Sequence, residues 1–271
     1  MRIQKLILIV IFGVALLAAN DKDSSFTSAK FLVSGIAGGS GELKDAGTSP
    51  LSYKGLTAIL PFAYISENSK ESFDLGMNIG YLAGSAASNY NLQLFSGEVY
   101  FGYLRNIEIF KRPDLLFQAG GHLSAAVTGS INPSLQNATL NMDYFTALSA
   151  SAQLQYLFER PAINKKIAFI KIRKPHRKYA IHFRMDLPLL MFNGRPTFPY
   201  VIEDDNDIFN RNYFLGGFQL KTDLGIKRYL PNGNALELAY LWEMYTSGNK
   251  DIYLLERASH NIQFSFYFKL N

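Results

Sequence analysis

The chain has 271 residues, with 27 basic and 22 acidic side chains and no cysteine. The absence of cysteine excludes disulfide bonds, thiolate metal sites, a cysteine nucleophile and a lipid anchor carried on cysteine. Two basic residues lie in the first five positions, so 25 basic groups face 22 acidic ones in the rest of the chain. That excess is too weak to predict nucleic acid or another polyanion as a partner.

The first 20 residues have the layout of a secretory signal. Arg2 and Lys5 precede an apolar run over Leu6–Leu17, and small residues follow it. This predicts a Sec-type signal cut near residues 19 to 20, followed by one domain over 21–271. The alternative, an uncleaved anchor helix, needs about 20 apolar residues. Later segments are less apolar, so any membrane crossing would require strands.

About ten strand-like segments follow, separated by turn-rich stretches at the spacing of an antiparallel meander. They are expected near residues 26–38, 52–66, 71–84, 90–105, 114–128, 142–158, 178–190, 212–229, 234–245 and 258–270. An even number of such strands closes into an up-and-down barrel with both termini at one end. In outer-membrane barrels that end is periplasmic.

Alternation within these segments predicts which solvent each face meets. In the third segment Leu75, Met77 and Ile79 lie between two aromatic residues, and Asp, Gly and Asn take the alternate positions. The last segment repeats the pattern, with an apolar row made of Ile262, Phe264, Phe266, Phe268 and Leu270. Such rows are typical of a lipid-facing wall, so an all-β transmembrane barrel is predicted. The alternative fold is a soluble periplasmic β-protein.

The connections test the number of strands, because periplasmic connections are short and outer ones long. Residues 67–70 fit the short class, and residues 39–51 fit the long class. The connection over 159–177 is long although a short one is expected, and a strand at 167–172 would imply a barrel of twelve. The basic segment 164–178 is either a solvated turn or a contact with acidic headgroups or a partner.

A barrel of this size has a narrow interior, since open channels appear near about sixteen strands. The inward-facing charges nearly cancel, so we expect ion pairs that hold the barrel shut. The core of this network is His182, Arg184, Asp186, Lys221, Asp223, Glu237 and Glu243. Other inward polar residues are Asp74, Asn78, Glu98, Gln118, His122, Lys227, Gln263 and Lys269.

His122 and Ser124 allow a catalytic interpretation. Their spacing is similar to the His-x-Ser of outer-membrane phospholipase, whose third member is an Asn on the next strand. Asn137 or Asn141 lies in that region, but Ala125-Ala126 replaces the Asn-Gly pair of that family. The predicted faces also turn both residues inward, whereas a lipase would present them to the bilayer. Activation of the serine would have to follow from geometry.

The long stretch over 191–211 is a candidate contact loop, since function concentrates in loops on rigid barrels. Arg195, Phe198 and Tyr200, with adjacent prolines, suit a preorganised contact with another protein. Its acidic half lacks the glycine of a calcium loop, and we expect neither metal nor cofactor. The expected partners are outer-membrane lipid and another outer-membrane or surface protein, without nucleic acid.

The cysteine-free signal, the Gly-punctuated aromatic strands, the Asp186-Leu-Pro-Leu-Leu segment and the aromatic last strand resemble small outer-membrane β-barrel proteins of Bacteroidota. The ending Leu270-Asn271 departs from the C-terminal Phe of proteobacterial barrels. The resemblance implies a Gram-negative outer membrane and a non-enzymatic accessory or structural subunit that contacts a partner in an envelope complex. The alternatives are a phospholipase-like hydrolase using His122 and Ser124, and a narrow channel for a small solute.

Overall fold

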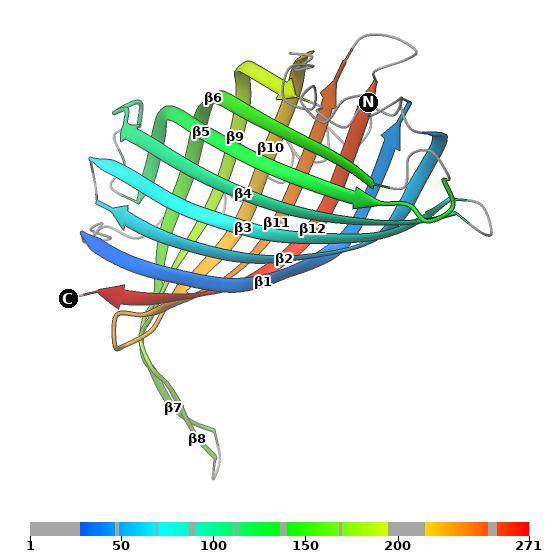
Figure 1. Cartoon of the computed structure of the whole chain (residues 1–271). Coiled ribbons are helices and arrows are strands. Elements are labelled where there is room, and N and C mark those ends of the chain that lie inside the picture. Colours follow the sequence, from blue (N-terminus) through cyan, green and yellow to red (C-terminus); the bar gives the residue numbers. More distant parts are fainter. Residues whose placement is uncertain are drawn as a thin grey trace, which may run out of the picture.

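The computed structural model describes residues 28–46, 49–68, 70–86, 90–110, 112, 114–135, 140–167, 170–194, 215–248 and 254–270. The predicted signal, over 1–20, lies outside these residues, as do Arg195, Phe198 and Tyr200 of the candidate contact loop. Ten antiparallel strands close into one barrel, as expected from the sequence (Figure 1). Within the described ranges, no helix is long and apolar enough to cross a membrane.

The barrel strands are β1 (Ala29–Asp45), β2 (Ser49–Glu67), β3 (Glu71–Ala86), β4 (Tyr90–Asn106), β5 (Leu115–Ile131), β6 (Leu140–Arg160), β9 (Arg177–Gly194), β10 (Leu215–Tyr229), β11 (Ala235–Ser247) and β12 (Leu255–Leu270). Consecutive strands pair, and β1 pairs with β12, so the sheet closes on itself. Because the strand number is even, β1 begins where β12 ends. We call this end of the barrel the terminal end and the other the distal end.

Two short strands lie outside the wall. β7 (Ile163–Ile167) and β8 (Ile170–Lys174) pair with each other in a separate two-stranded sheet. This hairpin joins β6 to β9 and projects from the terminal end of the barrel, at the bottom of the view in Figure 1. The long basic connection therefore contains strands, but they do not enlarge the barrel to twelve.

The first connection is short, and the expectation of a long turn over 39–51 was wrong. β1 continues through Gly39 to Asp45, and β2 begins at Ser49. A Cβ atom added at Gly39 would lie 1.8 Å from the carbonyl oxygen of His260 on β12. The glycine is thus needed for a close approach of two strand backbones and does not mark a turn.

A bulge interrupts β9 in the Asp186-Leu-Pro-Leu-Leu segment. Leu148 on β6 pairs with Leu190, but the next residue, Ser149, pairs with Pro188, which leaves Leu189 as an extra residue. Proline has no N–H to give to a ladder and is tolerated at such a position. Leu189 and Leu190 are both exposed, so the bulge turns two consecutive leucines outward.

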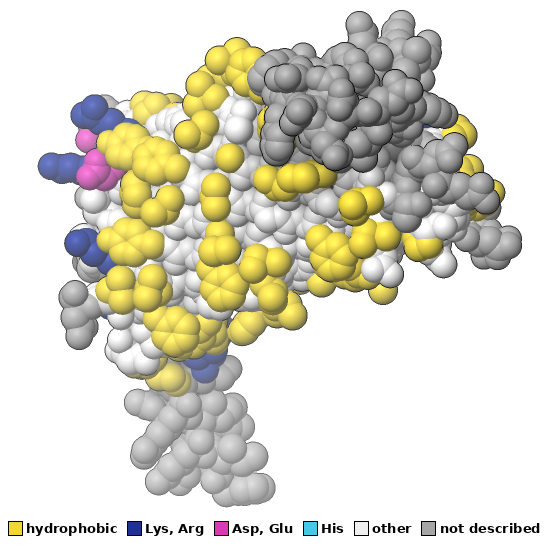
Figure 2. Space-filling view, in the orientation of Figure 1, with side chains coloured by type: hydrophobic (Ala, Val, Ile, Leu, Met, Phe, Trp, Pro, Cys, Tyr) yellow, Lys and Arg dark blue, Asp and Glu magenta, His cyan; other side chains and the backbone are white. Residues whose placement is uncertain are grey.

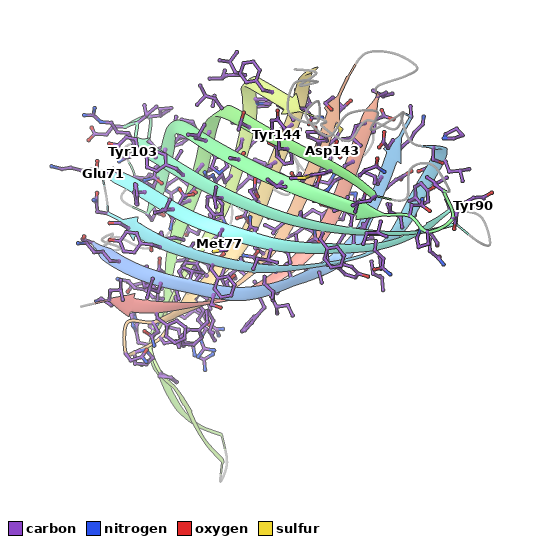
Figure 3. The ribbon with its side chains drawn as sticks, in the orientation of Figure 1. Glu71, Met77, Tyr90, Tyr103, Asp143 and Tyr144 are labelled. Carbon is purple, nitrogen blue, oxygen red and sulfur yellow. The ribbon has the colours of Figure 1, made fainter. Side chains whose placement is uncertain are left out.

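The outer wall is apolar. Leu75, Met77 and Ile79 on β3 are 52%, 42% and 48% exposed, whereas Asp74, which precedes Leu75 on the same strand, is buried. The apolar row of β12 is likewise outward, with Ile262 62% exposed. Figure 2 shows such side chains spread over the wall, and Figure 3 places Met77 between the two ends of the barrel.

Charged side chains on outward positions gather at two rims. The distal rim carries the ion pairs Lys44–Glu256 and Lys54–Glu42, and the terminal rim carries Lys30, Glu71 and Arg105. Between the rims, the outward positions of the described barrel strands hold no Asp, Glu, Lys or Arg. Glu71 and Tyr103 stand together at one end in Figure 3, and Tyr90 lies at the other. The wall is therefore a continuous uncharged band.

Candidate functional site in the barrel interior

The interior has three layers. Towards the distal end, the interior holds an apolar cluster made of Leu43, Tyr53, Leu82, Ala86, Leu92, Leu94, Ala126, Phe145, Ala147, Met191, Tyr245 and Leu255. At the terminal end, a smaller cluster is built on Phe31, Val33, Ala235 and Tyr267. Between these clusters lies a polar cavity of about 260 Å3, lined by side chains from all ten barrel strands. All seven residues predicted as the interior network line this cavity.

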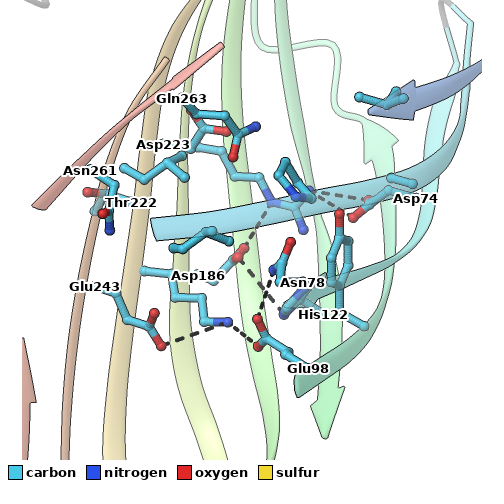
Figure 4. A pocket seen from close by; sticks show the side chains of 18 of the residues that line it. Asp74, Asn78, Glu98, His122, Asp186, Thr222, Asp223, Glu243, Asn261 and Gln263 are labelled. Atoms are coloured by element: carbon cyan, nitrogen blue, oxygen red, sulfur yellow. Dashed lines mark hydrogen bonds and ion pairs between the residues drawn. The ribbon is translucent and has the colours of Figure 1, made fainter. Parts of the chain in front are cut away.

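Arg184 on β9 organises the first ion network of the cavity. Its Nη1 donates to both carboxylate oxygens of Asp74 on β3, at 3.2 and 3.3 Å. Its Nε donates to Asp186 Oδ1 at 3.1 Å. The other Asp186 oxygen lies 4.0 Å from Nδ1 of His122, whose ring packs on Tyr100 with centroids 5.5 Å apart. The guanidinium thus joins two carboxylates, as shown in Figure 4.

Lys221 on β10 organises the second network. Its ammonium contacts Glu98 on β4 and lies 3.9 Å from Glu243 Oε1 on β11. Both carboxylates receive further hydrogen bonds: Asn78 donates to Glu98 at 3.0 Å and Gln219 donates to Glu243 at 2.7 Å. The register of β10 and β11 pairs Lys221 with Glu243 directly, which is the position where opposite charges stabilise a sheet.

Lys227, also on β10, organises the third network near the terminal end. Its ammonium lies 3.3 Å from Glu67 on β2 and 3.9 Å from Glu237 on β11. The same ammonium sits 4.2 Å from the centroid of the Tyr267 ring. His182 has its Nε2 3.3 Å from Asp223 and its Nδ1 4.0 Å from Glu237, so both ring nitrogens face a carboxylate. This network adjoins the terminal apolar cluster.

The three cations share one geometry. Each bridges two carboxylates, and one of the two lies on the opposite side of the barrel: Asp74 for Arg184, Glu98 for Lys221 and Glu67 for Lys227. The interactions therefore run across the interior between β2–β4 and β9–β10. We call these three interactions the cross-barrel bridges.

Carboxylates outnumber cations around the cavity. The carboxylates are Glu67, Asp74, Glu98, Asp186, Asp223, Glu237 and Glu243, and the cations are Arg184, Lys221, Lys227 and Arg257. With both histidines neutral, the seven carboxylates and four cations give a formal charge of −3. The expected near-cancellation of charge is thus only approximate. Lys269, expected in this set, is exposed at the end of β12.

Inward-facing glycines leave the space that these networks occupy. A Cβ atom at Gly102 on β4 would lie 2.3 Å from Oδ1 of Asp74, and one at Gly225 on β10 would lie 2.4 Å from the His182 ring. In both cases the glycine is the cross-strand partner of the polar residue. These inward-facing glycines thus allow large polar side chains to lie against the neighbouring strand.

His122 and Ser124 face the interior, and their geometry does not form a catalytic triad. Ser124 Oγ is buried and has no hydrogen-bond partner among the described residues. Ser124 on β5 pairs with Ala147 on β6, and Asn141 precedes Ala147 by six residues on that strand. Six residues span about 20 Å in a strand, which is too far for a shared proton relay. Asn137 lies outside the described residues.

Sequence reasoning missed several residues of the cavity. Glu67 lies one residue beyond the predicted end of its strand, although it shares a face with Ile65, and Tyr100 shares a face with Glu98. The two-residue period could have found both. The inward face of β2 carries Ile59, Pro61, Ala63 and Ile65, so the cavity has one apolar side. Alternation could not show this, since both faces of β2 are apolar.

No family model matches this chain, and neither does any curated protein sequence. Several solved outer-membrane barrels show limited structural similarity to it. The transport unit of the autotransporter AIDA-I from Escherichia coli is 13% identical with a TM-score of 0.43, covering 94% of both chains. The translocator domain of NalP from Neisseria meningitidis is 9% identical with a TM-score of 0.33, covering 94% of this chain and 92% of that one. The COG4313 outer membrane channel from Pseudomonas putida F1 is 8% identical, with a TM-score of 0.30 over 93% and 98%.

Proposed function

We propose that this chain is an integral outer-membrane barrel with a closed interior, and that it serves as a non-enzymatic accessory or structural subunit of an envelope complex. The observation that carries the proposal is the three-layered interior. A layer of paired charges lies between an apolar cluster at the distal end and a smaller one at the terminal end, and we expect these clusters to interrupt any continuous polar path through the barrel.

The outer wall supports membrane residence. An uncharged band between two charged rims is what the hydrocarbon core of a bilayer requires, because a charge there is strongly unfavourable. Aromatic side chains gather towards the terminal rim, where Phe73 lies 5.2 Å from Phe101 and Phe158 lies 5.1 Å from Tyr179, measured between ring centroids. Aromatic girdles of this kind are typical of the membrane–water interface. The proposed orientation places the terminal end in the periplasm.

The interior gives little support to conduction or hydrolysis. A permeating solute would have to displace the distal cluster, which includes Tyr53, Phe145 and Tyr245, and then part the cross-barrel bridges. Hydrolysis at Ser124 would require a base bonded to its hydroxyl and a route for lipid into the interior. The function is therefore assigned to surfaces at the two ends of the barrel.

Fractionation and electrical recording test this proposal together. The native chain is expected in the outer-membrane fraction after an alkaline carbonate wash, with a folded band in SDS gels that shifts on heating. In planar bilayers the purified barrel is expected to show no stable conductance. A variant with Tyr53→Ala, Phe145→Ala and Tyr245→Ala serves as a comparison, since it removes the largest side chains of the distal cluster. Stable conductance of the native barrel, or its release by carbonate, would contradict the proposal.

The accessory role is tested by affinity capture from gently solubilised outer membranes. A companion protein at constant stoichiometry is expected. Deletion of residues 195–207, which contain Arg195, Phe198 and Tyr200, is expected to abolish association while the barrel remains folded. Capture of the barrel alone would contradict the accessory role, and unchanged association of the deletion variant would exclude that loop as the contact.

A further inference from the structure

We infer that the β7–β8 hairpin is a docking element to which an acidic, extended segment of another envelope protein adds as a further strand. This inference deepens the proposed function and rests on it, because it assigns one contact of the accessory subunit to the terminal end. Three observations carry it: the charge of the hairpin, the unpaired edges of its strands and its direction relative to the wall.

The hairpin is strongly basic. Residues 163–174 contain Lys165, Lys166, Lys171, Arg173 and Lys174 and no acidic residue. The backbone register pairs Lys166 with Lys171, so both strands carry a basic residue at the same position of the hairpin. At the base of the hairpin, Glu159 is already bonded to His176 and Lys178, each at 2.9 Å. An acidic partner would supply the counter-charge that the hairpin sequence lacks.

The backbone of the hairpin is available for pairing. In the described part of the chain, β7 and β8 hydrogen-bond only to each other, so each strand has one edge without a ladder partner. Unpaired edges of this kind are templates for an added strand, and an isolated two-stranded hairpin is only marginally stable in water. An extended segment that joined either edge would gain main-chain hydrogen bonds and complete the sheet.

The charge and the position of the hairpin indicate which kind of partner it binds. A second copy of the hairpin would bring five more positive charges, so self-association is disfavoured. Lipid contacts the uncharged band of the wall, whereas the hairpin points away from that wall at the terminal end (Figure 1). An extended protein segment that alternates acidic and β-branched residues matches both the charge of the hairpin and its strand geometry.

A designed peptide tests the inference without knowledge of the natural partner. The probe is a fluorescent ten-residue peptide of alternating Glu and Val, titrated against the full-length folded barrel in detergent at low salt. Saturable binding is expected by fluorescence anisotropy, with at least a tenfold loss in Lys166→Glu/Lys171→Glu. The matched control is Lys44→Glu/Lys54→Glu at the distal rim, which changes the net charge equally and should bind within about twofold of the native barrel, since surface charges act over about 10 Å.

A second peptide separates strand addition from simple charge attraction. It carries Pro in place of each Val, which keeps the charge but removes half of the backbone donors. Its binding is expected to be at least tenfold weaker, and only the Val peptide should slow hydrogen exchange in residues 163–174. Equal binding of the two peptides would overturn strand addition. No binding to the native barrel, or equal loss in both double variants, would overturn the hairpin as the site.

These results are separable from the test of the proposed function. A barrel that shows no conductance and does not bind the acidic peptide would overturn this inference and leave the closed-barrel proposal intact. A conducting barrel that binds the peptide through its hairpin would contradict the proposed function and leave the docking element standing.

Discussion

The interior of the barrel and the β7–β8 hairpin are both rich in charge, but they differ in how that charge is balanced. Inside, Arg184, Lys221 and Lys227 each lie within 4.0 Å of two carboxylates. The hairpin has five basic residues and no acidic one. The interior cations find carboxylates within the chain and help to maintain its structure, whereas the hairpin cations need a counter-charge from outside.

The largest expected effect comes from breaking a cross-barrel bridge. Arg184→Met leaves Asp74 and Asp186 buried without their cation, which should lower the free energy of unfolding by about 3–5 kcal/mol. Urea titration of the barrel in detergent, followed by the folded band in SDS gels, measures this loss of stability. A triple variant with Asp74→Asn and Asp186→Asn added should recover most of it, because the unpaired charges are then gone. A single-variant loss below about 1 kcal/mol would show that the bridge does not hold the interior together.

A smaller effect is expected where a side chain is forced into the interior. Gly102→Leu places carbon atoms where the Asp74 carboxylate now lies and should destabilise the barrel by about 1–3 kcal/mol. Gly97→Leu is the matched control on the same strand, since a Cβ atom there would have nothing within 4 Å. Equal urea midpoints for the two variants would contradict the packing described around Asp74.

Glu159 links the two regions, because it lies where the barrel wall leads into the hairpin. Partial burial opposes its ionisation, but hydrogen bonds from Lys178 and His176 outweigh burial and lower the pKa of Glu159 below its ordinary value of 4.5. A lowered carboxyl pKa stabilises the fold above the ordinary pKa, and this stabilisation disappears as pH falls through the folded-state pKa.

Glu159→Gln should therefore destabilise the barrel by about 0.5–1 kcal/mol at pH 7, since the group is partly exposed. The difference from the native chain should be smaller at pH 3, well below the ordinary carboxyl pKa of 4.5, because the stabilisation is lost as the group protonates. Urea midpoints of both proteins at the two pH values measure this. A difference that persists unchanged at low pH would mean that the carboxylate charge is not its source.

The smallest effect on the barrel is expected from removing the hairpin. Replacing residues 163–174 by a short turn should change the free energy of unfolding by less than about 0.5 kcal/mol, because the hairpin makes no ladder with the wall. The same variant should lose binding of the acidic peptide. A large loss of barrel stability would mean that hairpin and wall form one cooperative unit.

Much of the wall could be predicted from the sequence, because lipid imposes a strict two-residue period. Leu75, Met77 and Ile79 on β3 are outward as the alternation requires, and the ten barrel strands appear near their expected positions. The predicted first connection over 39–51 is misplaced because Gly39 lies inside β1. A glycine that permits close strand approach and a glycine that ends a strand look the same in one sequence.

The interior was less accessible to sequence reasoning. Alternation indicates which side chains point inward, and so it found Arg184 and Lys221. It does not predict how far along the barrel axis each residue lies, or which strand lies on the opposite side of the barrel. The cross-barrel pairing of Arg184 with Asp74 depends on how the strands are staggered around the barrel, which has no periodic signal. The apolar clusters at both ends were missed for the same reason.

The cross-barrel bridges also bear on how the barrel is assembled. Strands β1–β6 contribute three carboxylates to the cavity and no cation, whereas β9–β12 contribute four cations and four carboxylates. A half-formed barrel that contained only the first six strands would therefore carry an acidic concave surface. Its three carboxylates meet Arg184, Lys221 and Lys227 only when β9 and β10 arrive, so the late strands supply the cations that the early strands lack.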